Sequence, residues 1–97
     1  MLRIVEILVP ESLKITCKCN DGSLWELDLN PVLQQENMPD DVKKLENLKF
    51  LQKVQIGKCG ELVWRRIVKN RLVDGKPQYW DYDISPEYFF HHAQKLT

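Results

Sequence analysis

Two segments of alternating polarity, 13–19 and 23–29, flank the tight-turn sequence Asn20-Asp21-Gly22. Alternation with a period of two is typical of a β-strand that buries one face and exposes the other. Because Asp-Gly tolerates the positive φ angles that hairpin turns require, the two segments are predicted to pair as an antiparallel hairpin. Its apolar face would carry Leu13, Ile15, Cys17 and Cys19 from the first segment, and Trp25, Leu27 and Leu29 from the second.

A third strand is predicted before this hairpin, because residues 2–9 form an apolar, β-branched run that Pro10 closes. The run resembles a signal peptide in hydrophobicity, but Glu6 lies in its middle and no small-residue cleavage site follows it. No apolar stretch approaches the roughly 18 residues that cross a bilayer. We therefore expect three antiparallel strands with one apolar face, in a cytoplasmic protein that does not contact a membrane.

The middle of the chain changes to helical spacing. Pro31 ends the alternation, and residues 31–38 are expected to be a loop with one turn of helix. A helix is predicted from about residue 40 to 52, since Asp40 and Asp41 suit the positive end of a helix dipole. Its apolar stripe would consist of Val42, Leu45, Leu48 and Leu51.

The second half of the chain is predicted to form a long hairpin. A short strand is expected at residues 54–56 and a longer one at 62–73, because both are rich in β-formers. Asp-Gly-Lys-Pro at 74–77 is a turn signal, and the aromatic segment 78–83 would be the return strand.

A final helix is predicted after this hairpin, with Ser85 as its N-cap and Pro86 at its first position. Its buried side would comprise Tyr88, Phe89, His92 and Leu96. The predicted fold class is therefore α+β, in a single domain of residues 1–97. It consists of a small antiparallel sheet with an N-terminal three-strand meander, a middle helix, a second long hairpin and a C-terminal helix.

Charge and thiol content narrow the function classes. Lysine plus arginine and aspartate plus glutamate each number 14, so the net charge is zero. Nucleic-acid binders usually carry a basic surplus, which this chain as a whole lacks. The three cysteines are an odd count without an export signal, and we expect reduced thiols.

Four short motifs follow one another along the chain. Residues 28–33 read Asp-Leu-Asn-Pro-Val-Leu, 48–56 suggest a short helix running into a strand, 60–64 read Gly-Glu-Leu-Val-Trp, and 83–90 read Asp-Ile-Ser-Pro-Glu-Tyr-Phe-Phe. Their order resembles the small bacterial proteins known as domain of unknown function 2442, over nearly the whole chain. In that family only a few residues usually separate the tryptophan from the last aspartate. Here 18 residues do, 65–82, which we interpret as an extended hairpin inserted into the common core.

The resemblance implies an α+β fold with a small sheet and packed helices, and it implies no activity, since the family has no established one. Some relatives are joined to helix-turn-helix domains, and others lie beside small uncharacterised genes in arrangements that look like toxin–antitoxin pairs. Both associations favour a binding role. The partner expected from them is another small protein encoded next to this chain, which would be the antitoxin-like member, and a homodimer is the other expected assembly.

The polar residues do not suggest a catalytic or metal site. The serines lie in turns or caps without a base nearby, and the four glycines form no phosphate-binding loop. The residues whose types could ligate a metal ion are Cys17, Cys19 and Cys59 with His91 and His92. Two cysteines so close in a strand are expected to face the core, and adjacent histidines on a helix point about 100° apart. We expect no metal, no cofactor and no enzyme activity.

Asp81 and Asp83 are the one carboxylate pair that a strand would place on one face, as an acid–base or cation site requires. The alternative is that Asp83 caps or hydrogen-bonds the turn before the last helix. The alternative is favoured, because no third ligand is visible in the sequence.

The inserted hairpin is the candidate binding site, because basic and aromatic side chains interleave along it. These residues suit a protein interface, where Trp, Tyr and Arg serve as anchors. They also suit stacking on single-stranded nucleic acid, or a core of aromatics covered by arginine stems. We expect a protein partner, bound through this hairpin or an open sheet edge, with nucleic acid as the alternative. The candidate partner-binding residues are Trp64, Arg65, Arg66, Lys69, Arg71, Tyr79, Trp80 and Tyr82.

Overall fold

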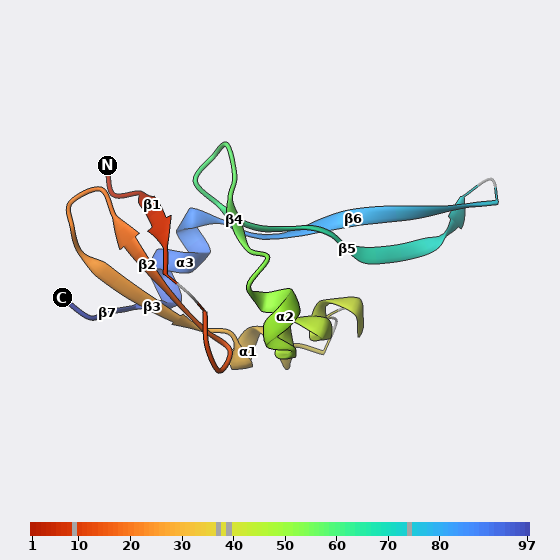
Figure 1. The fold of residues 1–97 in the computed structure, drawn as a ribbon, viewed down its shortest axis with the longest axis horizontal. Helices are drawn as coiled ribbons and strands as arrows, with labels where there is room; N and C mark the ends of the chain where they lie inside the picture. The colour runs from red at the N-terminus through yellow and green to blue at the C-terminus, as the bar shows by residue number, and fades with distance from the viewer. Residues whose placement is uncertain (9, 37, 39, 74) are drawn as a thin grey trace.

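The computed structural model of the chain describes residues 1–8, 10–36, 38, 40–73 and 75–97, and the side chains of these residues outside 69–73 and 77. The chain folds as an α+β protein with two antiparallel sheets and short helices, which confirms the predicted fold class. The first sheet and the helices form the body of the molecule, and the second sheet leaves it as a long hairpin (Figure 1).

The first sheet contains the predicted meander and one strand that was not predicted. Its strands are β1 (Ile4–Ile7), β2 (Lys14–Cys19), β3 (Leu24–Asp28) and β7 (Gln94–Lys95). They lie in the order β1-β2-β3-β7, and all neighbours are antiparallel. The apolar face is as predicted for Ile15, Cys17, Cys19, Leu27 and Leu29, which are buried, whereas Leu13 and Trp25 are half-buried.

The turn between β2 and β3 is held by a short chain of hydrogen bonds. Gly22 adopts φ +85°, the positive angle that Asp-Gly predicts. The Asp21 carboxylate accepts hydrogen bonds from the backbone N–H and the hydroxyl of Ser23, and these bonds lower the pKa of Asp21. The Trp25 indole in turn donates to Ser23 Oγ at 2.9 Å. The hairpin at the start of the chain is therefore specified locally.

The helix predicted over 40–52 is not continuous, and this prediction was wrong. A 3-10 helix, η1 (Asp40–Glu46), is followed by the α-helix α2 (Leu48–Leu51). Between them, Asn47 has extended backbone angles, and its side chain caps α2 by accepting a hydrogen bond from Lys49 N at 2.9 Å. Asparagine competes with the helix for backbone hydrogen bonds, so it ends one helix and begins the next.

The apolar stripe of this segment changes at the same break. Val42 and Leu45 are buried, because residues three apart lie above one another in a 3-10 helix. Leu51 is buried in α2, but Leu48 is 45% exposed, although it was predicted to be buried. The break at Asn47 turns Leu48 out of the stripe, whereas Leu51 stays buried.

The other helices lie where they were predicted. The turn of helix in the loop is α1 (Asn30–Leu33), which buries Val32 and Leu33. Within the part of the chain that the structure describes, no helix is long and apolar enough to cross a membrane.

The last helix, α3 (Pro86–His92), begins at its predicted cap, because Ser85 Oγ accepts the backbone N–H three residues on at 3.1 Å. Phe89 is fully buried, as predicted. The predicted buried side is wrong for His92, which is exposed, and for Leu96, which lies beyond the helix and is 45% exposed. The chain leaves the helix after His92 in an extended conformation, so that it can pair with β3 as β7.

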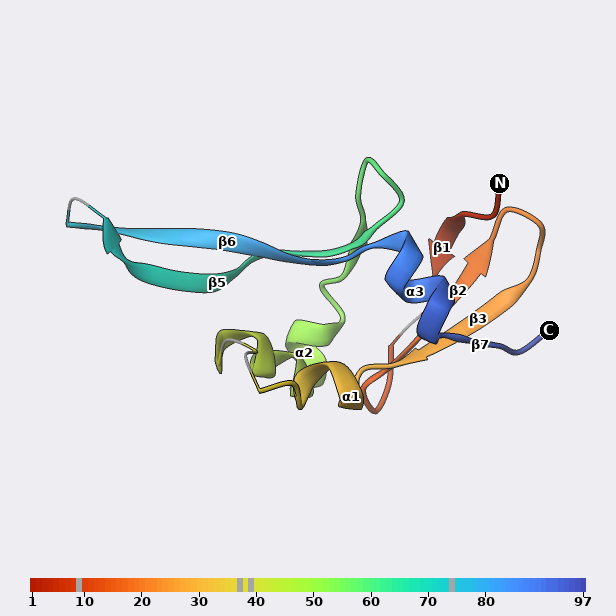
Figure 2. The same ribbon diagram turned by 180° about the vertical axis from the view of Figure 1, so that it is seen from behind.

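The second sheet has the order β4-β5-β6 and is dominated by one hairpin. Its strands are β4 (Gln55–Ile56), β5 (Leu62–Val73) and β6 (Lys76–Ile84). The return strand thus starts before residue 78, where it was predicted to start, and the predicted turn residue Asp74 lies outside the described residues. Views from opposite sides show β5 and β6 projecting from the body together, which makes the molecule 49 Å long and about half as wide (Figures 1 and 2).

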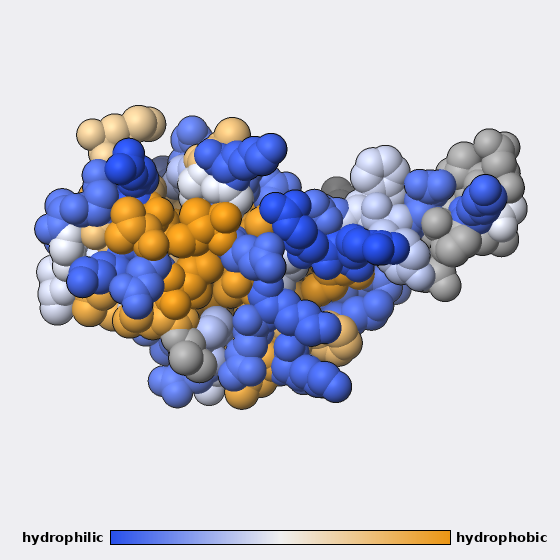
Figure 3. All heavy atoms as spheres, turned by 45° about the horizontal axis from the view of Figure 1, so that its top comes forward, coloured by the Kyte–Doolittle hydropathy of each residue, from blue (hydrophilic) through white to orange (hydrophobic). Residues whose placement is uncertain are grey.

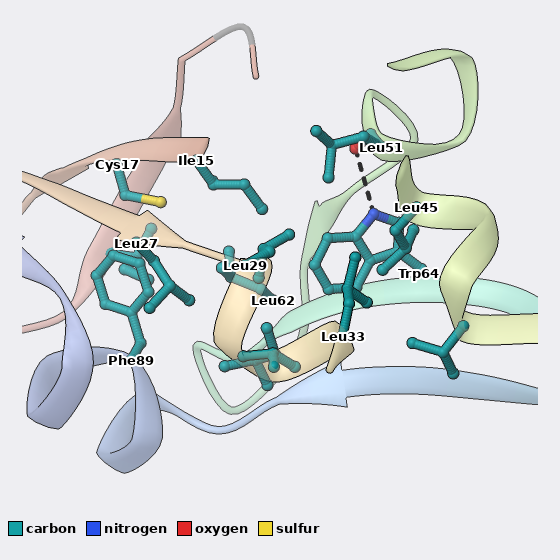
Figure 4. Packing of buried hydrophobic residues seen from close by; sticks show 14 of the residues in the cluster. Ile15, Cys17, Leu27, Leu29, Leu33, Leu45, Leu51, Leu62, Trp64 and Phe89 are labelled. Atoms are coloured by element: carbon teal, nitrogen blue, oxygen red, sulfur yellow. Dashed lines mark hydrogen bonds between the residues drawn. The ribbon is translucent and has the colours of Figure 1, made fainter. Parts of the chain in front are cut away.

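One cluster of buried side chains joins both sheets to the helices. Trp64 of β5 is 1% exposed, and its indole Nε1 donates a hydrogen bond to the carbonyl oxygen of Leu51 at 3.2 Å (Figure 4). Ile15 and Leu27 from the first sheet and Phe89 from α3 belong to the same cluster. The base of the projecting hairpin is therefore anchored in the core.

Candidate interaction surface

The candidate surface is the arm, which we define as the part of β5 and β6 beyond the cross-strand pair Trp64 and Tyr82. At this pair the two rings contact each other, with centroids 5.8 Å apart, and Trp64 belongs to the core. Beyond it the arm continues as a two-stranded ribbon, in which Val68 pairs with Trp80. Its position makes it the most protruding part of the molecule (Figure 2).

A β-bulge lies at the root of the arm. The register slips between Trp64 and Val68, so residues 65–67 lie opposite Asp81 alone. Arg66, in the middle of the bulge, has φ +53°, in the left-handed region that non-glycine residues rarely adopt. Bulges bend a strand and redirect its side chains, and they are frequent beside functional sites.

The Asp81 carboxylate holds this bulge. One of its oxygens accepts a hydrogen bond from the backbone N of Arg66 at 2.8 Å, and the other accepts one from Nη1 of Arg65 at 3.3 Å. Nε of Arg65 also donates to Gln55 Oε1 at 3.2 Å. The Arg66 guanidinium lies 4.9 Å from the centre of the Tyr79 ring. Both arginines are thus positioned by contacts within the second sheet.

The bulge decides which side chains of β5 are buried. In a regular strand, Trp64 and Arg66 would share a face, because side chains alternate. Instead Trp64 and Ile67 are both buried, and Arg65 and Arg66 are both exposed. The sequence does hold a signal of this, since two consecutive arginines between large apolar residues interrupt the alternation.

The arm exposes aromatic side chains near the bulge. Trp80 is 55% exposed and Tyr79 is 43% exposed. Because they are consecutive in a strand, they project from opposite faces of the ribbon, Tyr79 with Arg66 and Trp80 with its cross-strand neighbour Val68. Exposed Trp and Tyr are the residue types that most often anchor protein interfaces.

The arm also presents a free strand edge. β6 is the last strand in the order of the second sheet, and residues 78–81 are exposed. Among the described strands none pairs with its outer side, so part of its backbone N–H and C=O groups face solvent. An unpaired edge of this kind can accept a strand from another chain.

The predicted partner-binding residues do not all reach this surface. Of these predicted residues, Arg65, Arg66, Tyr79 and Trp80 have exposed side chains on the arm. The side chains of Lys69 and Arg71 lie outside the described part of the chain.

Two of the predicted contact residues belong mainly to the interior. Trp64 is buried and offers a partner no surface, which corrects its place among the candidate contact residues. Tyr82 is half-buried against it, and burial, followed by the nearby Tyr88 and Asp83, raises the pKa of the Tyr82 phenol. These two rings attach the arm to the core.

The body exposes apolar side chains too, around β1 and β4, which lie side by side. Val5 is 48% exposed, Leu8 is 36% exposed and Ile56 is 37% exposed. Apolar residues cover part of the body in the space-filling view, while hydrophilic residues gather where the arm begins (Figure 3). The exposed residues named here are aliphatic, whereas those of the arm are aromatic.

A hollow at the root of the arm gathers basic side chains that sequence reasoning did not connect. They come from η1, from the turn after α2 and from the bulge in β5. Phe50, Trp64 and Ile67 complete its wall. We call this site the basic hollow, and its basic residues are Lys44, Lys53, Arg65 and Arg66.

Cysteines and histidines are spread over the molecule. Cys17 and Cys19 are buried in the first sheet, and Cys59 is exposed in the turn before β5. His91 and His92 are both exposed, with ring centroids 4.8 Å apart and nearly perpendicular planes. Among the described residues, no three His, Cys, Asp or Glu side chains are grouped so that they could hold a metal ion.

The thiols are expected to differ sharply in reactivity. Burial, with a smaller contribution from Cys19, raises the pKa of Cys17 to about 12, and burial also raises the pKa of Cys19. The thiolate is the reactive form, so both should be inert at pH 8 while the exposed Cys59 reacts. We expect a disulfide reagent such as dithionitrobenzoate to modify one thiol in the native protein and all three in denaturant. Rapid native modification of a second thiol would contradict the burial of this pair.

Searches for related proteins do not extend this picture. No family model matches the chain, and neither a curated protein nor a solved structure matches it. The similarity to the domain of unknown function 2442 proteins therefore stays a prediction, and the function is inferred from the surface of this chain.

Proposed function

We propose that this protein is an interaction module that binds another protein through the arm. The observation that carries the proposal is the exposure of Trp80 and Tyr79 on a ribbon that projects from the core. A tryptophan that is 55% exposed contributes little to folding, but it can bury a large apolar area against a partner. The same residue types dominate the binding energy of measured interfaces.

The free edge of β6 supports the same proposal. A two-stranded ribbon is marginally stable in water on its own, and pairing with a third strand would add backbone hydrogen bonds along its free edge. Trp80 and Tyr79 point to opposite faces of the ribbon, so an added strand would have an aromatic anchor on either side. The mode we propose is therefore strand addition to β6, with the two rings fixing the partner's position.

The charge distribution favours a protein over nucleic acid. Arg65 is ion-paired with Asp81 at 3.3 Å, and Asp83 is exposed on the same strand. Nucleic-acid binding draws most of its strength from unpaired cations that neutralise phosphates, so carboxylates beside the arginines weaken it. The net charge of zero points the same way.

The partner we propose is a small protein encoded beside this chain, with this chain as the antitoxin-like member, and self-association is the second possibility. Co-expression with the neighbouring gene product, followed by affinity and size-exclusion chromatography, tests both. We expect a stable complex of the two chains. Clean separation of the chains, with this protein eluting as a monomer, would refute both assemblies. Binding to single-stranded DNA that weakens steeply with salt and is lost on replacing Arg65, Arg66 and Arg71 by alanine would favour nucleic acid instead.

A further inference from the structure

The basic hollow draws its side chains from segments far apart in the sequence. Lys44 lies in η1, Lys53 follows α2, and Arg65 and Arg66 are consecutive in β5. Like charges repel, so four cations around one hollow weaken the fold unless something compensates them. None of the described residues that line the hollow is acidic.

Carboxylates just outside the hollow compensate two of these cations. Lys44 Nζ lies 3.3 Å from Asp41, and Arg65 Nη1 lies 3.3 Å from Asp81. The described contacts of the other two charged groups are with aromatic rings: Lys53 Nζ lies 5.2 Å from the centre of the Phe50 ring, and the Arg66 guanidinium lies over Tyr79. Such contacts are weak at exposed sites and leave the positive charge in place. Among the residues that the structure describes, no carboxylate is paired with Lys53 Nζ or the Arg66 guanidinium, so the hollow keeps these two positive charges.

The bulge fixes this arrangement before any ligand arrives. Two consecutive residues of a regular strand point to opposite faces, but both arginines line the hollow. Arg66 does so because its backbone holds a left-handed conformation that Asp81 stabilises through the Arg66 N–H. Backbone strain of this kind is unfavourable and persists only where the surrounding contacts hold it. A preformed pair of guanidinium groups suits an oxyanion, which can accept several N–H bonds at once.

We propose that the basic hollow binds one oxyanion group, the carboxylate of an acidic side chain on the protein partner. This inference rests on the proposed function, because the hollow lies at the root of the arm and its Arg66 lies over Tyr79 of β6, so a partner bound at Tyr79 would reach it. A carboxylate there would pair with Lys53 and Arg66 while Trp80 and Tyr79 bind apolar groups. An acidic side chain close to an apolar one is the feature that the partner should show.

The hollow suits a carboxylate better than a nucleic acid. Sequence-tolerant binding of single strands needs aromatic faces on which bases stack. Trp64 is buried and its indole N–H is already bonded to Leu51, and Lys53 lies over the ring of the half-buried Phe50. The hollow therefore supplies charge at one point and no open ring.

The first test uses the isolated protein and two small probes, sodium sulfate and sodium glutarate, at constant ionic strength set with chloride. Backbone and arginine side-chain NMR signals are followed during the titration. We expect saturable shifts at the Arg65 and Arg66 signals for both probes. Replacing Lys53 by glutamine, or Arg66 by asparagine, should raise the dissociation constant at least about 5-fold, since each removes a charge-assisted contact of roughly 1 kcal/mol.

Matched variants keep this test specific. Asparagine tolerates a left-handed backbone, so Arg66→Asn removes the charge and keeps the bulge. Lys18→Gln removes an exposed charge from β2 and should leave the dissociation constant unchanged. Linear, non-saturating shifts for both probes, or equal effects of Lys18→Gln and Lys53→Gln, would overturn the site.

The second test asks where the oxyanion comes from. In the co-purified complex, Lys53→Gln should weaken partner binding at least about 5-fold. Full affinity in this variant would overturn the assignment to a partner carboxylate. Binding of a dT12 oligonucleotide that Lys53→Gln abolishes would overturn it too, in favour of a phosphate. Because the small-anion titration needs no partner, the site can fail while the complex forms, and it can stand while no complex is found.

Discussion

Replacing Trp80 by alanine is expected to weaken binding of the partner at least about 30-fold, which corresponds to roughly 2 kcal/mol for an interface anchor. The Trp80 indole is 55% exposed, so its exposed surface is available to be buried against a partner. The same exposure means that the fold gains little from it. The free energy of unfolding should therefore fall by less than about 1 kcal/mol.

The measurement is titration calorimetry with the purified partner, together with urea unfolding of each variant alone. Leu96→Ala is the matched control, because Leu96 is an apolar residue 45% exposed near the C-terminus, at the opposite end of the molecule (Figure 1). Ile56→Ala tests the aliphatic surface of the body. If Trp80→Ala binds normally and Ile56→Ala does not, the partner uses the body and the proposal for the arm is wrong.

Replacing Trp64 by alanine, in contrast to Trp80, should act mainly on stability and should lower the free energy of unfolding more than any other substitution proposed. Trp64 is 1% exposed at the centre of the core, and its indole N–H bonds the Leu51 carbonyl oxygen. Truncation of a buried tryptophan costs about 3–5 kcal/mol, through lost burial and the cavity left behind. Since a domain of this size is stable by roughly 5–15 kcal/mol, much of its stability would be lost.

Urea unfolding followed by circular dichroism measures this loss, with Trp80→Ala as the control for removing a tryptophan. Trp64→Phe keeps most of the apolar volume and loses the hydrogen bond, so it should cost less than alanine and still fold. A midpoint for Trp64→Ala equal to that of Trp80→Ala would show that the arm is not anchored through this ring.

The elements specified by neighbouring residues were predictable. The turn at Asp21-Gly22 needs only a glycine at positive φ and a carboxylate that bonds Ser23, and both are adjacent in sequence. Ser85 caps α3 by a bond three residues along. Such signals act over a few residues, so a sequence read locally contains them.

The elements decided by distant partners were missed. Nothing in residues 94–95 predicts β7. This strand forms because α3 ends beside the free edge of β3, with which residues 94–95 then pair. Leu48 fits an apolar stripe by spacing alone, yet the cap at Asn47 turns it outward. Spacing shows which residues could share a face, but it does not show whether the helix continues.

The candidate site divides in the same way. The basic and aromatic composition of segment 65–82 is apparent from the sequence, and it indicates that the hairpin is the candidate binding site. Which aromatic is core and which is surface is not apparent from it, because Trp64 lies at the base of the hairpin in the core, whereas Trp80 lies on the part that projects beyond it. Lys44 and Lys53 meet the two arginines only after η1, α2 and the bulge are folded together. Local hydrogen bonds and side-chain alternation act between neighbours in the chain, whereas burial and the meeting of charges depend on segments that only folding brings together.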